Sequence, residues 1–135
     1  MSEGRESVLE GVPALLPALQ RAHRLQEKAS KVGFDWERKE DVWKKVIEEI
    51  EEMHDSEKEG NHDKLESEIG DVLFAMVNYA RFLGVNPENA LRRTNTKFIK
   101  RFGYVEDKVT ATGKKLSESN LEEMDKYWEE SKKNF

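Results

Sequence analysis

The segment from Ile69 to Ala80 reads IGDVLFAMVNYA, and Asp71 is its only charged residue. A lone carboxylate inside so apolar a run is costly to remove from water unless something compensates its charge. A fold that buries this run must therefore also give Asp71 a partner.

More acidic residues precede Asp71 at regular spacing. Glu68 lies one helical turn upstream, and Glu48, Glu49 and Glu52 form a second cluster. The combined pattern is E-E-x-x-E, fifteen residues, then E-x-x-D. These carboxylates supply enough oxygen ligands to hold a divalent cation between two helices.

The composition favours an all-α fold. The 135 residues predict a single domain over 1–135, and 38% of them are charged against 36% hydrophobic, with a mean hydropathy of -0.87. A compact protein with this much charge is usually built from helices with solvated faces and narrow apolar stripes. The three prolines and eight glycines leave room for long helices.

Terminator and capping signals predict a bundle of about five helices after a flexible lead-in at 1–12. Gly33, Gly60, Gly84 and Gly113 follow the first four segments. Asn86 with Pro87, and Asn120 with Glu123, are N-terminal capping patterns. The expected helices cover 13–31, 39–59, 63–83, 87–110 and a short C-terminal stretch after Asn120.

Several classes of protein are disfavoured. The chain has no cysteine, which excludes disulfides, thiolate metal sites and a thiol nucleophile. The charged N-terminal segment does not resemble a signal peptide, and no apolar run approaches the roughly 18 residues of a membrane span. The net charge of -5 disfavours nucleic acid as a partner. These features predict a cytoplasmic protein without a membrane partner.

The acidic residues occupy defined helical faces. At about 100° per residue, Glu48, Glu49 and Glu52 lie within an arc of roughly 100°, which on its own is typical of a solvated face. Glu68 and Asp71 share stripes with apolar residues and border the core, where a salt bridge to lysine or arginine is the simpler alternative. Five acids meeting between two helices repel unless they share a cation. The all-oxygen set favours magnesium, with manganese as a substitute.

Other residues suit a polyphosphate ligand. Arg93, Lys97 and Arg101 are spaced by four and form one ridge, which is either a solvated face or a phosphate site. Asn78 and Asn95 add neutral hydrogen-bonding groups. The indoles of Trp36 and Trp128 can stack on a base, although such residues more often serve as core or rim residues.

With these motifs the sequence resembles the MazG nucleoside triphosphate pyrophosphohydrolases, specifically the catalytic C-terminal domain of the two-domain form. The resemblance covers nearly the whole chain. It rests on GVPALLPAL, on KVGFDW at 31–36, on E-E-x-x-E at 48–52, on LESEIGDVLFAMVNYARFLG at 65–84 and on NPENALRRTNTKFIKRFGYVE at 86–106. The chain departs from the long form at Thr94, where alanine is usual, and at Lys100, where arginine is usual.

The resemblance implies an all-α, dimeric, magnesium-dependent hydrolase. It makes a metal-binding set of Glu48, Glu49, Glu52, Glu68 and Asp71. It implies that Lys97 and Arg101 contact the substrate phosphates, and that Lys31, Trp128 and Lys132 lie near the nucleotide. The expected substrates are nucleoside triphosphates and their deoxy forms, and the expected products are a nucleoside monophosphate and pyrophosphate.

In this interpretation Glu49 or Glu52 orients or deprotonates the attacking water, and Lys97 and Arg101 stabilise charge on the phosphates. Two alternatives stay open. One is a helical interaction or regulatory module that keeps the fold without the activity. The other is a related all-α pyrophosphatase of narrow specificity, for deoxyuridine triphosphate or phosphoribosyl-ATP.

Overall fold

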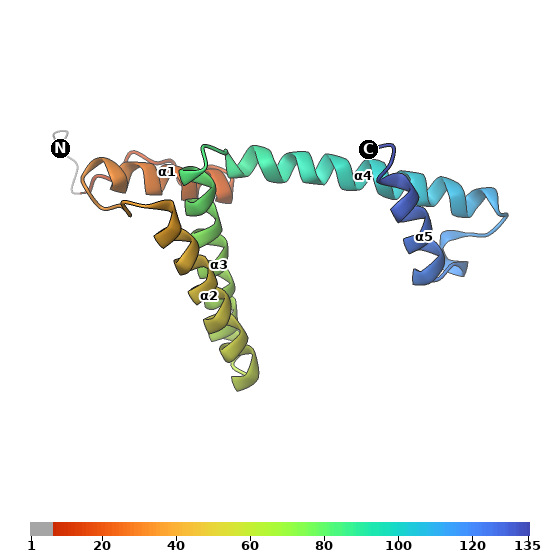
Figure 1. The fold of residues 1–135 in the computed structure, drawn as a ribbon, viewed down its shortest axis with the longest axis horizontal. Helices are drawn as coiled ribbons and strands as arrows, with labels where there is room; N and C mark the ends of the chain where they lie inside the picture. Colours follow the sequence, from red (N-terminus) through yellow and green to blue (C-terminus); the bar gives the residue numbers. More distant parts are fainter. Residues whose placement is uncertain (1–6) are drawn as a thin grey trace. The chain divides into compact units, whose positions relative to one another are not determined.

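The computed structural model describes residues 7–135, and positions 1–6 of the expected lead-in lie outside the described residues. Within the described part, the chain forms five α-helices and one short 3₁₀ helix without any strand, so the all-α prediction is confirmed (Figure 1). The elements are α1 (Ala18–Lys31), α2 (Lys39–Glu59), α3 (His62–Phe82), α4 (Pro87–Ala111), η1 (Leu116–Glu118) and α5 (Leu121–Ser131).

The first helix begins later than the expected position 13. Pro17 is its N-cap residue, with an extended ψ of 142°, and its carbonyl accepts the first helical hydrogen bond from the Arg21 N–H at 2.8 Å. Proline disfavours helical geometry in the residue before it. Pro17 therefore fixes the helix start, and Pro13 lies in the preceding turn region.

The other helix ends follow the sequence signals. Gly60 adopts a left-handed φ of 73°, which allows α2 to end in a tight turn. The side chain of Asn61 then accepts a hydrogen bond from the Lys64 N–H and caps α3. Asn120 caps α5 in the same way, through the Glu123 N–H at 2.9 Å.

By its packing the described part of the chain divides into two compact units, with the boundary between Glu88 and Asn89. The expectation of one domain over 1–135 stays a prediction. In the first unit, α2 and α3 pack along each other and α1 packs against α3 (Figure 1). Small apolar side chains fill the space between these helices: Val42, Val46, Ala75 and Val77.

One face of α3 carries large apolar side chains that the protomer leaves exposed. Ile69, Leu73 and Met76 recur at helical spacing, and Leu73 is 53% exposed. Trp43 and Ile47 on α2 are also exposed, one turn apart. The apolar run at 69–80 is therefore only partly buried within one chain.

In the second unit, α5 packs on α4 around an aromatic cluster. The Phe98 ring lies 5.9 Å from that of Phe102 and 5.4 Å from that of Trp128, and Val105 and Val109 are fully buried. Across residues 7–135, none of the helices combines the length and apolarity that a membrane span requires.

Candidate metal and nucleotide site

Three of the predicted metal ligands converge in the first unit. Glu49 on α2 and Glu68 and Asp71 on α3 each offer a carboxylate oxygen, and these oxygens lie within 4.8 Å of one another. Among the described residues this is the group that could hold a metal ion. The packing of α2 against α3 brings together residues that are far apart in sequence.

Two oxygens in this group are buried without a hydrogen-bond partner. Glu49 is only 6% exposed, and its Oε2 and the Oε2 of Glu68 lack a partner among the described residues. A buried carboxylate oxygen without a donor is unfavourable unless a cation neutralises it. The donor set is all oxygen, which is the preference of magnesium and manganese. These residues therefore fit a hard divalent cation.

A lysine partly neutralises the cluster. The Lys45 ammonium lies 2.9 Å from Glu49 Oε1 and 3.5 Å from Glu48 Oε1. The hydrogen bond to Glu49 is the main reason why the pKa of Lys45 is raised above its ordinary value. The salt bridge considered from the sequence concerned Glu68 and Asp71, whereas Lys45 pairs with two acids of its own helix, Glu48 and Glu49.

The two remaining predicted ligands border this group. Glu48 is exposed and faces Lys45, and Glu52 is exposed one turn after Glu48. The negative charge of Glu49, together with smaller effects of desolvation and of Glu68, raises the pKa of the Glu52 carboxyl. Glu52 is therefore close enough to the cluster to be affected by its negative charge. The five-residue ligand set stays a prediction.

A cavity of about 880 Å³ opens beside the carboxylates, within the first unit. Glu49, Asp71 and Lys45 are among its charged lining residues. Phe34, Trp36 and Phe74 supply an apolar part, and Asn78 and Gln26 add amide groups. This combination of charged and aromatic side chains suits a ligand with a polyphosphate and a planar ring.

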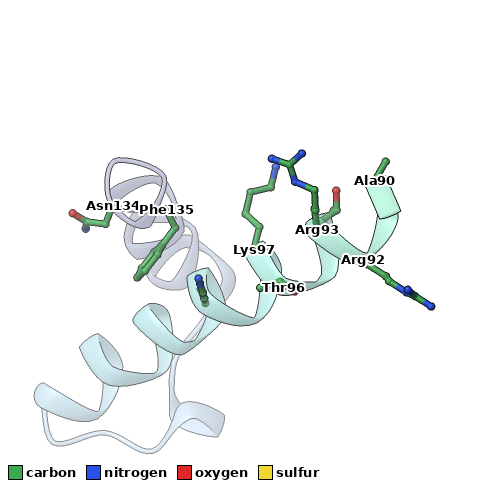
Figure 2. A pocket seen from close by; sticks show the side chains of 9 residues that line it. Ala90, Arg92, Arg93, Thr96, Lys97, Asn134 and Phe135 are labelled. Carbon is green, nitrogen blue, oxygen red and sulfur yellow. The ribbon is translucent and has the colours of Figure 1, made fainter. Parts of the chain in front are cut away.

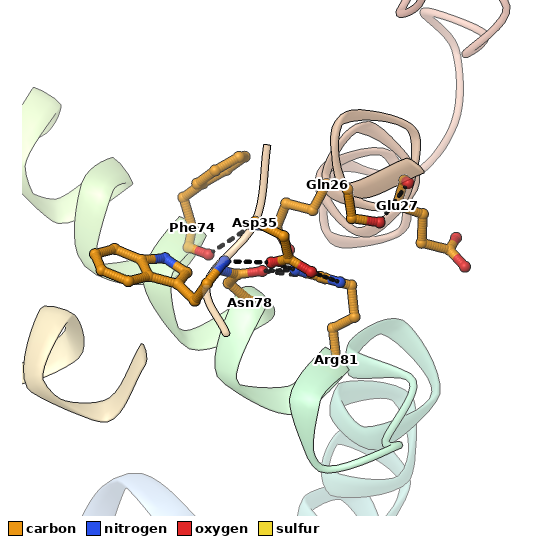
Figure 3. A network of polar contacts seen from close by, with 8 residues as sticks. Gln26, Glu27, Asp35, Phe74, Asn78 and Arg81 are labelled. Atoms are coloured by element: carbon orange, nitrogen blue, oxygen red, sulfur yellow. Dashed lines mark hydrogen bonds and ion pairs between the residues drawn. The ribbon is translucent and has the colours of Figure 1, made fainter. Parts of the chain in front are cut away.

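A network of polar contacts fixes one wall of this cavity (Figure 3). The Arg81 guanidinium binds both carboxylate oxygens of Asp35, at 2.6 and 3.2 Å. It also donates two hydrogen bonds to Oδ1 of Asn78, at 2.7 and 3.1 Å. Since the Oδ1 of Asn78 is occupied in this way, its amide NH₂ is the group left to donate to a ligand. The contact with Asp35 also ties the segment that carries Trp36 to α3.

We expect Asp35→Asn to destabilise the protein by about 1 kcal/mol at neutral pH, because it weakens a paired, partly buried contact. Hydrogen bonding from Arg81 holds the pKa of Asp35 below its ordinary value of 3.8. The stabilisation is therefore present above that ordinary value and is lost as the pH falls through the lowered one. Urea unfolding at several pH values measures this difference.

Glu59→Gln is the matched control, because it weakens an exposed ion pair with Lys64, at 2.8 Å. Little change is expected there at any pH. A difference between Asp35→Asn and wild type that persisted in strong acid would contradict the electrostatic explanation.

In the second unit, basic residues of α4 line a hollow of about 730 Å³. Figure 2 shows Arg93 and Lys97 on the same side of the helix, with Arg92 pointing away. Phe135 borders the same hollow, and its carbonyl oxygen accepts a hydrogen bond from Arg101 at 2.8 Å. The ridge predicted from the sequence is thus concave and cationic at Arg93 and Lys97, whereas Arg101 binds the chain's own backbone.

The other predicted nucleotide-binding residues are spread over both units. Lys31 is exposed at the end of α1, and Asn95 is exposed on α4. Trp128 packs against Phe98 and lies 5.9 Å from the guanidinium carbon of Arg101. Lys132 forms an exposed ion pair with Glu129 at 3.1 Å. Their roles stay predictions.

The sequence analysis missed Lys45, Asp35, Arg81 and Gln26. The role of Lys45 could have been predicted from the sequence, because Lys45 lies three and four residues before Glu48 and Glu49 on one helix. The contact between Asp35 and Arg81 spans 46 residues and had no local signal. Gln26 is buried and donates to the Phe74 carbonyl at 3.0 Å, a contact that depends on how α1 packs against α3.

Residues 37–105 match the MazG nucleotide pyrophosphohydrolase domain, and this span contains all five predicted metal ligands. The chain belongs to the MazG family. Membership confirms the resemblance drawn from the motifs.

Individual proteins that are similar to this chain over nearly its whole length support the same family. The nucleoside triphosphate pyrophosphohydrolase/pyrophosphatase MazG of Thermotoga maritima is 42% identical over 95% of this chain, which covers 49% of that protein. The nucleoside triphosphate pyrophosphohydrolase of Escherichia coli is also 42% identical, over 97% of this chain and 51% of the relative. The uncharacterized protein YabN of Bacillus subtilis is 49% identical, but the chain covers only 26% of it. This MazG domain thus spans about half the length of the first two relatives.

Proposed function

We propose that this MazG domain hydrolyses the α–β phosphoanhydride of nucleoside triphosphates, ribo or deoxy, to a nucleoside monophosphate and pyrophosphate. The observation that carries the proposal is the convergence of Glu49, Glu68 and Asp71, with two buried oxygens that lack a partner. The names of the two relatives from Thermotoga maritima and Escherichia coli support the same reaction class. Because the reaction uses soluble nucleotides, we also propose a cytoplasmic location.

Magnesium is the proposed cofactor, with manganese as a substitute. Glu49, Glu68 and Asp71 would hold it, with Glu48 and Glu52 as further carboxylates at the border of the group. When bound, such an ion supplies positive charge for phosphate oxygens and makes water a better nucleophile.

The chain's own residues have distinct proposed roles. Glu52 is exposed next to the converging carboxylates, so it can accept the proton of the attacking water. Trp36 lines the cavity and can stack on the base. Asn78 presents its amide NH₂ there because Arg81 occupies its oxygen. Lys97 and Arg101 are proposed to bind phosphate oxygens.

Product identification tests the function directly. The protein is incubated with magnesium and a panel of ribo- and deoxynucleoside triphosphates, including deoxyuridine triphosphate, and the products are separated by chromatography. Monophosphate and pyrophosphate in equal amounts are expected. Orthophosphate and diphosphate would contradict the proposed bond, and turnover of deoxyuridine triphosphate alone would favour a narrow-specificity enzyme. Absence of any turnover would favour the interaction module.

We expect Lys97→Ala and Arg101→Ala each to lose about 10- to 100-fold in kcat/KM, and the double variant to lose more. A charge-assisted hydrogen bond to phosphate contributes roughly 1.5–3 kcal/mol. Manganese binding should stay near the wild-type level, since neither residue belongs to the carboxylate group. Lys108→Ala, on the same helix, removes an exposed charge as a control. Wild-type kcat/KM in the double variant would show that the ridge is a solvated face.

We also propose that the protein is at least a homodimer. The exposed apolar stripe of Ile69, Leu73 and Met76 on α3 is more typical of an interface than of free surface.

Sedimentation at micromolar concentration should give at least twice the protomer mass of 15.7 kDa. Leu73→Glu should shift the population to monomer, because a buried unpaired charge in an interface is strongly unfavourable. Ser67→Glu adds the same charge at an exposed site of α3 and should leave the assembly intact. A wild-type monomer at this concentration would refute the dimer.

A further inference from the structure

Lys45 has an unusual position for a surface lysine of a charged helix. Helical spacing places it one turn before both Glu48 and Glu49, and its ammonium contacts a carboxylate oxygen of each. Lys45 also lines the 880 Å³ cavity, together with Glu49 and Asp71. Its ammonium therefore brings a positive charge into direct contact with the buried Glu49 of this carboxylate cluster.

The contact uses only part of the negative charge present. Lys45 binds Oε1 of Glu49, while Oε2 of the same carboxylate and Oε2 of Glu68 stay buried without a partner. One ammonium is thus shared between Glu48 and Glu49, and this leaves the negative charge of the cluster only partly neutralised. A divalent cation would neutralise it better, but it would repel an ammonium held by the same Glu49 carboxylate.

Lysine is suited to leave such a position. Its ammonium is a point charge on a flexible four-carbon stem, so it can exchange one partner for another without backbone movement. Because the Lys45 side chain is 38% exposed at the cavity wall, the released ammonium would still be next to the ligand space.

We propose that Lys45 is the internal counter-ion of the metal-free site: the metal displaces its ammonium from Glu49, and the released ammonium then binds a phosphate of the substrate. This inference rests on the proposed metal site and assigns opposite effects to one residue. Lys45 competes with the metal but assists the nucleotide. A lysine with a purely structural role would support both ligands.

Lys45→Met separates these possibilities without measuring turnover. Manganese binding, measured by titration calorimetry without nucleotide, should become about tenfold tighter, because no ion pair with Glu49 has to be broken. Binding of a hydrolysis-resistant α,β-imido nucleoside triphosphate at saturating manganese should become about tenfold weaker, because a phosphate contact is lost.

The exposed neighbour Lys44 provides the matched control, because Lys44→Met removes the same charge from the same helix. Its effect on manganese affinity should not exceed about twofold, as expected for a screened surface charge. Lys45→Gln adds a second test if the methionine variant folds poorly. It keeps a donor for Glu49 without the charge, so it should also tighten manganese binding.

The outcomes are distinguishable. A wild-type protein that binds no manganese would overturn the metal site and this inference with it. Wild-type binding with no tightening in Lys45→Met or Lys45→Gln would overturn the role of Lys45 alone. Weakening of both ligands would show that Lys45 is structural, and equal tightening in Lys44→Met would show a general charge effect.

Discussion

Asp71→Asn and Glu49→Gln are each expected to lower kcat/KM by on the order of 10³-fold, equivalent to about 4 kcal/mol of transition-state stabilisation. Each change removes one negative charge from the converging carboxylates and nearly preserves the side-chain shape. The amide that replaces the carboxylate is a weak ligand for a hard cation. Steady-state kinetics with a nucleoside triphosphate that the wild type cleaves gives the comparison.

The two variants should differ in stability. Asp71 is exposed, so its replacement should leave the melting temperature of the metal-free protein nearly unchanged. Glu49 is buried and binds Lys45, so its replacement should lower that temperature. Circular dichroism would show whether the helices persist in both.

Glu51→Gln controls for charge in these experiments, because Glu51 lies on α2 but is exposed and outside the converging group. It should keep nearly wild-type kinetics. Either site variant with a kcat/KM within a few-fold of wild type would remove that residue from the site.

Removal of divalent metal by excess EDTA is expected to lower the turnover rate by at least about 10³-fold. The physical reason is that Glu49, Glu68 and Asp71 present negative charge where a phosphate must approach, so without a cation the site repels its substrate. Magnesium or manganese added back in excess of the chelator should restore the rate.

Metal addition should also raise the melting temperature, since a ligand that binds only the folded state stabilises it by mass action. Asp71→Asn should show a smaller rise than Glu51→Gln. Full turnover in EDTA, after dialysis against the chelator, would contradict the metal-dependent mechanism whatever the melting data show.

Local structure could be predicted well from this sequence because its signals are local. Gly60 and Asn61 end one helix and begin the next within two residues, through a left-handed turn and a side-chain cap. Asn120 likewise caps the N-terminus of α5 with its side chain. The start of α1 was predicted too early, because Pro13 and Pro17 both suit a first helical turn and only the backbone shows which one precedes the helix.

The candidate site was predictable in chemical type but not in detail. The spacing of the acids on two amphipathic helices indicated a shared cation, and three of the five converge. The partner of Glu49 had a local signal in the spacing of Lys45, whereas the wall made by Asp35, Arg81 and Asn78 had none.

The sequence by itself determined the helices, their ends and the presence of clustered carboxylates, because helix formation depends on neighbours within about four residues. Only the tertiary structure decided which oxygens are buried without a partner, and that Asp35 ties the Trp36 segment to α3. These features depend on the packing of α1 and α2 against α3, and burial is a property of that packing rather than of any residue alone.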